Sequence, residues 1–135
     1  MTEILVPVSP GELVDKITIL RLKSERISDP DKLANVTREL DLLNDVADHA
    51  LPENPRLAAL VDELFDTNAS LWDIEDDIRR CEARQHFGES FVALARAVYF
   101  TNDRRAELKK QINLLLGSGI IEEKSYVSID GSPQE

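Results

Sequence analysis

The stretch LWDIEDDIRRCE, at residues 71–82, gathers side chains whose types and spacing could do chemistry. Between a tryptophan and a pair of arginines lie four carboxylates, those of Asp73, Glu75, Asp76 and Asp77. On a helix, Asp73 is one turn away from Asp76 and Asp77, and carboxylates at this spacing can share a Mg²⁺ ion through their oxygens. A Mg²⁺-dependent phosphohydrolase is therefore one hypothesis.

The same acids fit equally well on the hydrated face of a helix, which is the usual role of a charged run. Helical nucleotide pyrophosphohydrolases need a second set of acids on a facing helix. Glu12 and Asp15 have a suitable spacing, but nothing in the sequence places them opposite Asp73. Leu71 and Ile74 belong to an apolar helical stripe, which turns Asp73 away from the core. We favour the hydrated face and predict no metal site.

The elements that carry these residues are predicted to be helices. Of 135 residues, 42% are hydrophobic, 5% are aromatic and five are glycine, a composition that favours helices over sheets. A capping residue followed by proline marks three helix starts, at Ser9-Pro10, Asp29-Pro30 and Asn54-Pro55. The predicted helices run from about 10 to 27, 30 to 51, 55 to 85 and 89 to 116, and Gly117 is a plausible C-cap.

These elements predict an all-α fold, an antiparallel bundle of about four helices in a single domain over residues 1–135. The connections between the helices are short, which favours antiparallel neighbours. The apolar run EILVPV at residues 3–8 and the segment Ser125–Ile129 are compatible with a short strand pair that joins the two ends of the chain. Residues 131–135 are expected to be disordered.

The first predicted helix is apolar on two sides. One stripe consists of Leu13, Ile17, Leu20 and Ile27, and Ile19 and Leu22 form another. Such a helix is buried on two sides, either in the centre of the bundle or against another protein. We expect a homodimer.

Polar residues interrupt the apolar faces of the two longest predicted helices. On the third helix they are Asn68, Glu75, Arg79 and Glu82, on a stripe that also contains Trp72, and on the fourth they are Asn102 and Arg105. If these helices fold back near residue 87, Asn68 lies near Arg105 or Ala106, and Trp72 lies opposite Asn102. The polar positions then form one layer between the two helices.

Two explanations compete for this layer, because buried polar groups need partners. In the first, Glu75 pairs with Arg105 or Arg79, Asn68 pairs with Asn102, and these pairs fix the register of the helices. In the second, the layer lines a pocket for a small anion that is held electrostatically, as in all-helical chorismate mutases. The candidate ligand-binding residues are Arg79, Arg104, Arg105 and Lys109 around the anion, with Glu75, Asn68, Asn102 and Trp72 beside it.

Charge and cysteine content exclude several classes of function. The formal net charge is −10, which repels nucleic acids and anionic membrane surfaces. No apolar run is long enough for a transmembrane helix. Cys81 is the single cysteine, so nothing argues for an oxidising compartment, and we expect a cytoplasmic protein. No phosphate-binding glycine loop or zinc spacing occurs, and no cofactor is predicted.

Five segments carry a resemblance to known proteins: SPGELVDKITIL, DKLANVTRELDLL, LWDIEDDIRRCE, FVALARAVYFTNDRRAELKKQIN and IIEEKSY. Together they resemble an uncharacterised bacterial family of small helical proteins, a domain of unknown function, over nearly the whole chain. Some members of that family look to be associated with glycosyltransferases of surface polysaccharide synthesis. The resemblance implies a context but no mechanism, and it carries over no site residue.

Our first hypothesis is a non-enzymatic interaction or accessory module that self-associates as a dimer. A second protein is a further candidate partner of this module. The second is a small-anion-binding helical enzyme or sensor that uses Arg105, Arg79 and Glu75. The third is the Mg²⁺-dependent phosphohydrolase.

Overall fold

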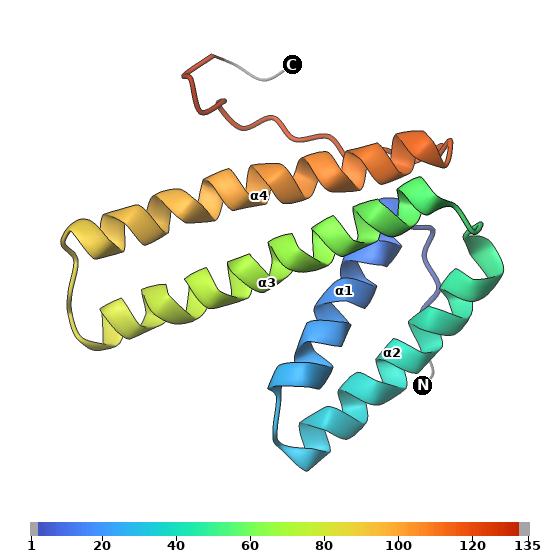
Figure 1. Cartoon of the computed structure of the whole chain (residues 1–135), viewed down its shortest axis with the longest axis horizontal. Helices are drawn as coiled ribbons and strands as arrows, with labels where there is room; N and C mark the ends of the chain where they lie inside the picture. Colours follow the sequence, from blue (N-terminus) through green and yellow to red (C-terminus); the bar gives the residue numbers. More distant parts are fainter. Residues whose placement is uncertain (1–2, 133–135) are drawn as a thin grey trace.

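The computed structural model describes residues 3–132 and folds them into four helices (Figure 1). They are α1 (Pro10–Arg26), α2 (Pro30–Ala50), α3 (Pro55–Ala83) and α4 (Glu89–Leu115). The all-α prediction is confirmed. None of these helices is long and apolar enough to cross a membrane.

The predicted helix starts are confirmed by their capping hydrogen bonds. Ser9 Oγ accepts a hydrogen bond from the backbone N–H of Glu12 at 3.2 Å. The side chains of Asp29 and Asn54 accept hydrogen bonds from the first turns of α2 and α3 in the same way. The end of α3 comes before the predicted Gln85, because that residue has a positive φ of 56°, which a right-handed helix cannot continue.

The helices form two antiparallel hairpins of unequal length (Figure 1). The longer hairpin is α3 with α4, and the shorter one is α1 with α2. Within the described chain, α1 contacts all three other helices, whereas α2 contacts α1 alone. The bundle is therefore asymmetric, with α1 as its central helix and α2 outside the core.

The core lies where α1 packs against the α3–α4 hairpin. Its buried members are Val14, Leu57, Leu60, Leu64, Leu108 and Ile112. Leu64, Leu108 and Ile112 have no exposed surface. The rest of the hairpin lies outside this core.

The central position of α1 explains its two apolar sides. Leu13, Ile17, Leu20 and Leu22 are all buried, and Ile19 is half-buried. Because α2 and the α3–α4 hairpin cover both sides, a partner protein is not needed to explain them. The two apolar sides of α1 therefore no longer argue for a homodimer, which stays a prediction.

Beyond α1 the α3–α4 hairpin extends as two helices, with only the segment after α4 beside part of α4 (Figure 1), and we call its residues 74–102 the arm. No residue between 69 and 107 is buried. The apolar seam between the helices of the arm, which includes Ile74, Ile78 and Leu94, is half-buried. The arm therefore has no buried core of its own.

The predicted strand pair is wrong. Neither 3–8 nor 125–129 forms a strand in the described chain. Figure 1 shows the reason: the first segment leads into the start of α1 on one side of α4, whereas the segment after α4 folds back along the other side of α4. Residues 131 and 132 close a turn in which Ser132 N–H donates to Asp130 Oδ1 at 2.9 Å, and the last three residues of the predicted disordered end lie outside the described residues.

Candidate functional site

The carboxylate of Asp15 joins three helices. From α4, Arg105 donates with Nε to Oδ1 at 2.9 Å and with Nη2 to Oδ2 at 2.5 Å. From α3, Asn68 donates with Nδ2 to Asp15 Oδ1 and to Thr18 Oγ1, both at 3.0 Å. The hydroxyl of Thr18 donates to the backbone carbonyl of Asp15 at 2.8 Å. These contacts bind α1 to both helices of the long hairpin.

Burial and charge act in opposite directions on this carboxylate. The Asp15 side chain is 2% exposed, and burial raises the pKa of a carboxyl group. The hydrogen bonds from Arg105 and Asn68 outweigh burial and hold the pKa of Asp15 below its usual value. The hydrogen bond to Asp15 in turn raises the pKa of Arg105. Both groups are therefore charged at neutral pH.

Lys109 extends the network one turn further along α4. Its Nζ donates to Glu12 Oε2 on α1 at 2.8 Å and to Glu122 Oε2 at 3.0 Å. Burial favours the neutral form of Lys109, but the two carboxylates outweigh it, so the pKa of Lys109 is raised. The hydrogen bond from Lys109 also lowers the pKa of Glu122. Lys109 thus ties α1 to the segment of residues 118–132, which we call the tail.

The start of α1 touches the backbone of α4 because residue 11 is a glycine. The N–H of Gly11 donates to Asn113 Oδ1 at 2.7 Å. A Cβ atom on residue 11 would lie 2.5 Å from the carbonyl oxygen of Lys109 and 2.9 Å from Asn113 Oδ1. Because the nearer of these atoms belongs to a helix backbone, a larger residue would force the two helices apart.

The structure brings together three of the predicted site residues, Asn68, Arg105 and Lys109. The predicted proximity of Asn68 and Arg105 is confirmed, since both donate to Asp15 Oδ1. The predicted pair of Asn68 with Asn102 is wrong, and Asn102 is exposed. The physical reason is that α1 packs against both helices, so their polar groups bond to α1 instead of to each other.

The other predicted site residues lie apart on the surface. Glu75 and Arg79 form one of the predicted pairs, at 2.8 Å, but they do so on an exposed face of α3 and not within a buried layer. Arg104 pairs with Glu63 at 2.7 Å, also in an exposed position. Trp72 is half-buried at the base of the arm. The eight residues therefore do not surround one common pocket.

The acids of LWDIEDDIRRCE are confirmed as a hydrated helix face. Asp73, Asp76 and Asp77 are exposed. Asp73 accepts a hydrogen bond from Arg26 at 2.6 Å, and Asp77 accepts one from Arg80 at 2.7 Å. In the part of the chain that the structure describes, no three His, Cys, Asp or Glu side chains are grouped to hold a metal ion. The geometry gives no support to a Mg²⁺-dependent phosphohydrolase.

The α1 half of the network was missed by the sequence analysis, although the sequence carried a signal for it. Gly11, Asp15, Thr18 and Leu22 follow one another at intervals of four, three and four, and all are buried. A polar pair on such a stripe indicates a buried polar contact. For Asn113 the signal is weaker: it follows Arg105 and Lys109 at intervals of four.

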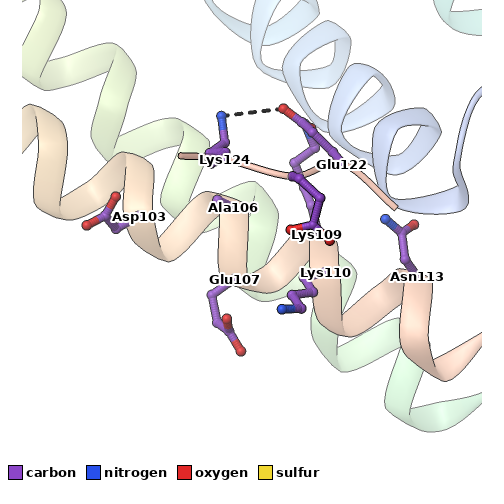
Figure 2. A pocket seen from close by; sticks show the side chains of 9 residues that line it. Asp103, Ala106, Glu107, Lys109, Lys110, Asn113, Glu122 and Lys124 are labelled. Atoms are coloured by element: carbon purple, nitrogen blue, oxygen red, sulfur yellow. Dashed lines mark hydrogen bonds and ion pairs between the residues drawn. The ribbon is translucent and has the colours of Figure 1, made fainter. Parts of the chain in front are cut away.

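The charged groups of this network bind one another and hold α1 against α3 and α4. Every buried side-chain nitrogen or oxygen among the described residues has a hydrogen-bond partner. The cavity beside Arg105 has a volume of about 30 Å³, which leaves room for a water molecule. A larger cavity of about 410 Å³ lies between α4 and the tail, lined by Lys109 and Asn113 among others (Figure 2).

A comparison with protein families supports the resemblance to a family of unknown function. The model of a family of unknown function, DUF6165, matches residues 4–134. None of the curated proteins matches the chain, and neither does any solved structure.

Proposed function

We propose, from the premise that this chain belongs to the DUF6165 family of unknown function, that it is a non-enzymatic helical interaction module that self-associates. The observation that carries the proposal is the arm, in which two long helices run side by side without a buried residue. Most of the stability of a helix in a protein comes from packing of its apolar face. A third or fourth helix is therefore expected to cover the arm, and two hairpins that pack together are a common way to build a four-helix bundle.

The outer face of α4 carries an apolar patch that another helix could cover. Its side chains are apolar or aromatic and are 43–73% exposed: Val92, Tyr99 and Phe100 from α4, and Tyr126, Val127 and Ile129 from the tail. A groove of about 450 Å³ runs between Tyr99 and Phe100 on one side and the three tail residues on the other. Contiguous apolar surface of this kind marks interaction sites on soluble proteins.

The charges around this patch favour a second copy of the same chain as the partner. Arg96 and Asp103 are equally far from the point between Tyr99 and Phe100. If two α4 helices pack antiparallel about that point, each Arg96 lies opposite the Asp103 of the other copy, and each Tyr99 lies opposite a Phe100. A twofold interface needs this kind of self-complementary pattern. Among the described residues, Arg96 and Asp103 form no ion pair that would compete, since no partner lies within 4.0 Å.

A charge exchange tests the proposal. We expect Arg96→Asp and Asp103→Arg each to weaken the dimer by about tenfold or more, because each variant places like charges opposite each other. An equimolar mixture of the two variants should form a heterodimer, in which both pairs are attractive again. Light scattering after size exclusion gives the masses, and Arg38→Asp on the exposed part of α2 is the control. Equal behaviour of both variants and the control, or a mixture that stays monomeric, would contradict the proposal.

The small-anion alternative receives less support from the geometry. Arg105 and Lys109 already hold carboxylates of the chain itself, while Arg79 and Arg104 lie elsewhere on the surface. We also propose a bacterial, cytoplasmic protein that acts in the context of glycosyltransferases. This setting is supported by the resemblance and by the single cysteine, and it adds nothing to the mechanism.

A further inference from the structure

The cavity between α4 and the tail has features of a ligand site, and of its lining residues only Asp103 also belongs to the proposed dimer interface. Its volume is about 410 Å³. One wall is α4, from Asp103 to Asn113, and the other is the tail around Glu122 and Lys124 (Figure 2). Both walls are polar, and they carry charges of both signs.

At one end of this cavity, Asn113 presents a hydrogen-bond donor that no described residue accepts. The residue is 2% exposed. Its Oδ1 accepts the N–H of Gly11, which fixes the orientation of the amide because a backbone N–H needs an acceptor. In Figure 2 the amide oxygen lies on the side of α1 and the nitrogen on the side of Lys109. That nitrogen, Nδ2, donates to no acceptor among the described residues. Because every fully buried side-chain nitrogen or oxygen in the described chain has a partner, Nδ2 keeps some accessible surface, and Asn113 lines the cavity.

Ammonium groups lie along the cavity beside this amide. Lys109 uses two of its three N–H groups for Glu12 and Glu122, which leaves one donor free. Lys110 lines the cavity from the next position on α4, and Lys124 lines it from the tail. Together with Asn113 Nδ2, these donors suit a carboxylate.

Carboxylates of the cavity wall suit an ammonium group in turn. The lining includes four acids, which are Asp103, Glu107, Glu122 and Glu123. Glu107 and Asn113 are six residues apart on α4, or about 9 Å along the helix axis, a span that a small molecule with two charged ends can cover. A dianion would face these acids and a dication would face the lysines, so a molecule with one charge of each sign fits best.

We propose that this cavity binds a small zwitterion that carries both a carboxylate and an ammonium group. Its carboxylate accepts hydrogen bonds from Asn113 Nδ2 and from Lys109 and Lys110. Its ammonium group lies between Glu107 and Glu123. The bound molecule joins α4 to the tail, so it makes the tail less mobile.

Three probes of similar length and different charge test the proposal: 4-aminobutyrate, succinate and 1,4-diaminobutane. The readout is the side-chain amide signal of Asn113 in ¹H–¹⁵N spectra of the full chain during titration. We expect a saturable shift with 4-aminobutyrate, with a dissociation constant on the order of 1 mM for so small a ligand. Succinate and 1,4-diaminobutane should shift the signal at least about tenfold more weakly.

A matched pair of variants separates the site from general charge effects. Asn113→Asp keeps the acceptor for Gly11 but replaces the free donor by an oxygen, so binding measured by calorimetry should fall about tenfold or more. Asn102→Asp places the same new charge on α4 outside this cavity and should leave binding unchanged. If Asn113→Asp does not fold, Lys110→Gln on the exposed rim serves instead and should weaken binding. The proposal is overturned if 4-aminobutyrate gives no saturable shift, if succinate binds as well, or if neither site variant changes binding.

Discussion

Asp15 of α1 and Arg105 of α4 are 90 residues apart in the sequence and form a two-pronged ion pair, with N–O distances of 2.9 and 2.5 Å. The Asp15 side chain is 2% exposed and the Arg105 side chain 31%. Such paired hydrogen bonds between charged groups are strong and directional. This pair, with Asn68 as the third member, determines where α1 sits on the long hairpin.

Replacing Asp15 by Asn should show the contribution of this pair. Asp15→Asn keeps the shape but leaves Arg105 without its counter-charge, and breaking a buried pair costs about 3–5 kcal/mol. Because Arg105 is 31% exposed, water compensates in part, and we expect a loss of about 2–3 kcal/mol in the free energy of unfolding by urea. Asp76→Asn on the exposed face of α3 should change the stability by less than about 0.5 kcal/mol. Equal effects of the two variants would show that the pair does not stabilise the fold.

The pH dependence of stability follows from the same carboxylate. The pKa of Asp15 in the folded protein lies below the usual value of 3.8, so its ionised form stabilises the fold above pH 3.8. This contribution is lost as the pH falls below 3.8 and through the lowered pKa. In urea unfolding measured at a series of acidic pH values, the natural protein should lose stability more steeply than Asp15→Asn. Parallel curves for the two proteins would exclude this role of Asp15.

The close contact at Gly11 predicts a strong effect of the smallest possible substitution. In Gly11→Ala the new Cβ would meet the Lys109 carbonyl oxygen at 2.5 Å, so α1 and α4 must separate. We expect a loss of about 1–3 kcal/mol in thermal or urea unfolding, as for other overpacked sites. Gly119→Ala, where a Cβ would meet nothing within 4 Å, is the control and should be near neutral. A Gly11→Ala protein as stable as the natural one would mean that α1 and α4 have room for a Cβ atom at this contact.

Local features of the fold could be predicted from the sequence, because each is decided within a few residues. Ser9, Asp29 and Asn54 cap their helices as expected, each followed by a proline. The polar layer that contains Asn68 and Arg105 was also predictable, because helix periodicity places both residues on inward faces.

The partners of these residues could not be predicted in the same way. Periodicity gives the direction of a side chain on its own helix, but not which other helix packs there. Asn68 and Arg105 were expected to bond across the hairpin, yet both bond to Asp15, because α1 and not α2 is the central helix. The strand pair failed for the same kind of reason: whether 3–8 and 125–129 meet depends on where the helices put the chain ends.

Self-association is the central claim, and the mass of the natural protein in solution tests it most directly. Native mass spectrometry across a dilution series in the micromolar range reports the number of subunits at each concentration. We predict a dimer that dissociates on dilution, since the open arm and the patch around Phe100 are covered in the dimer. A monomer at every concentration would contradict the claim and would mean that the arm is stable without a buried core.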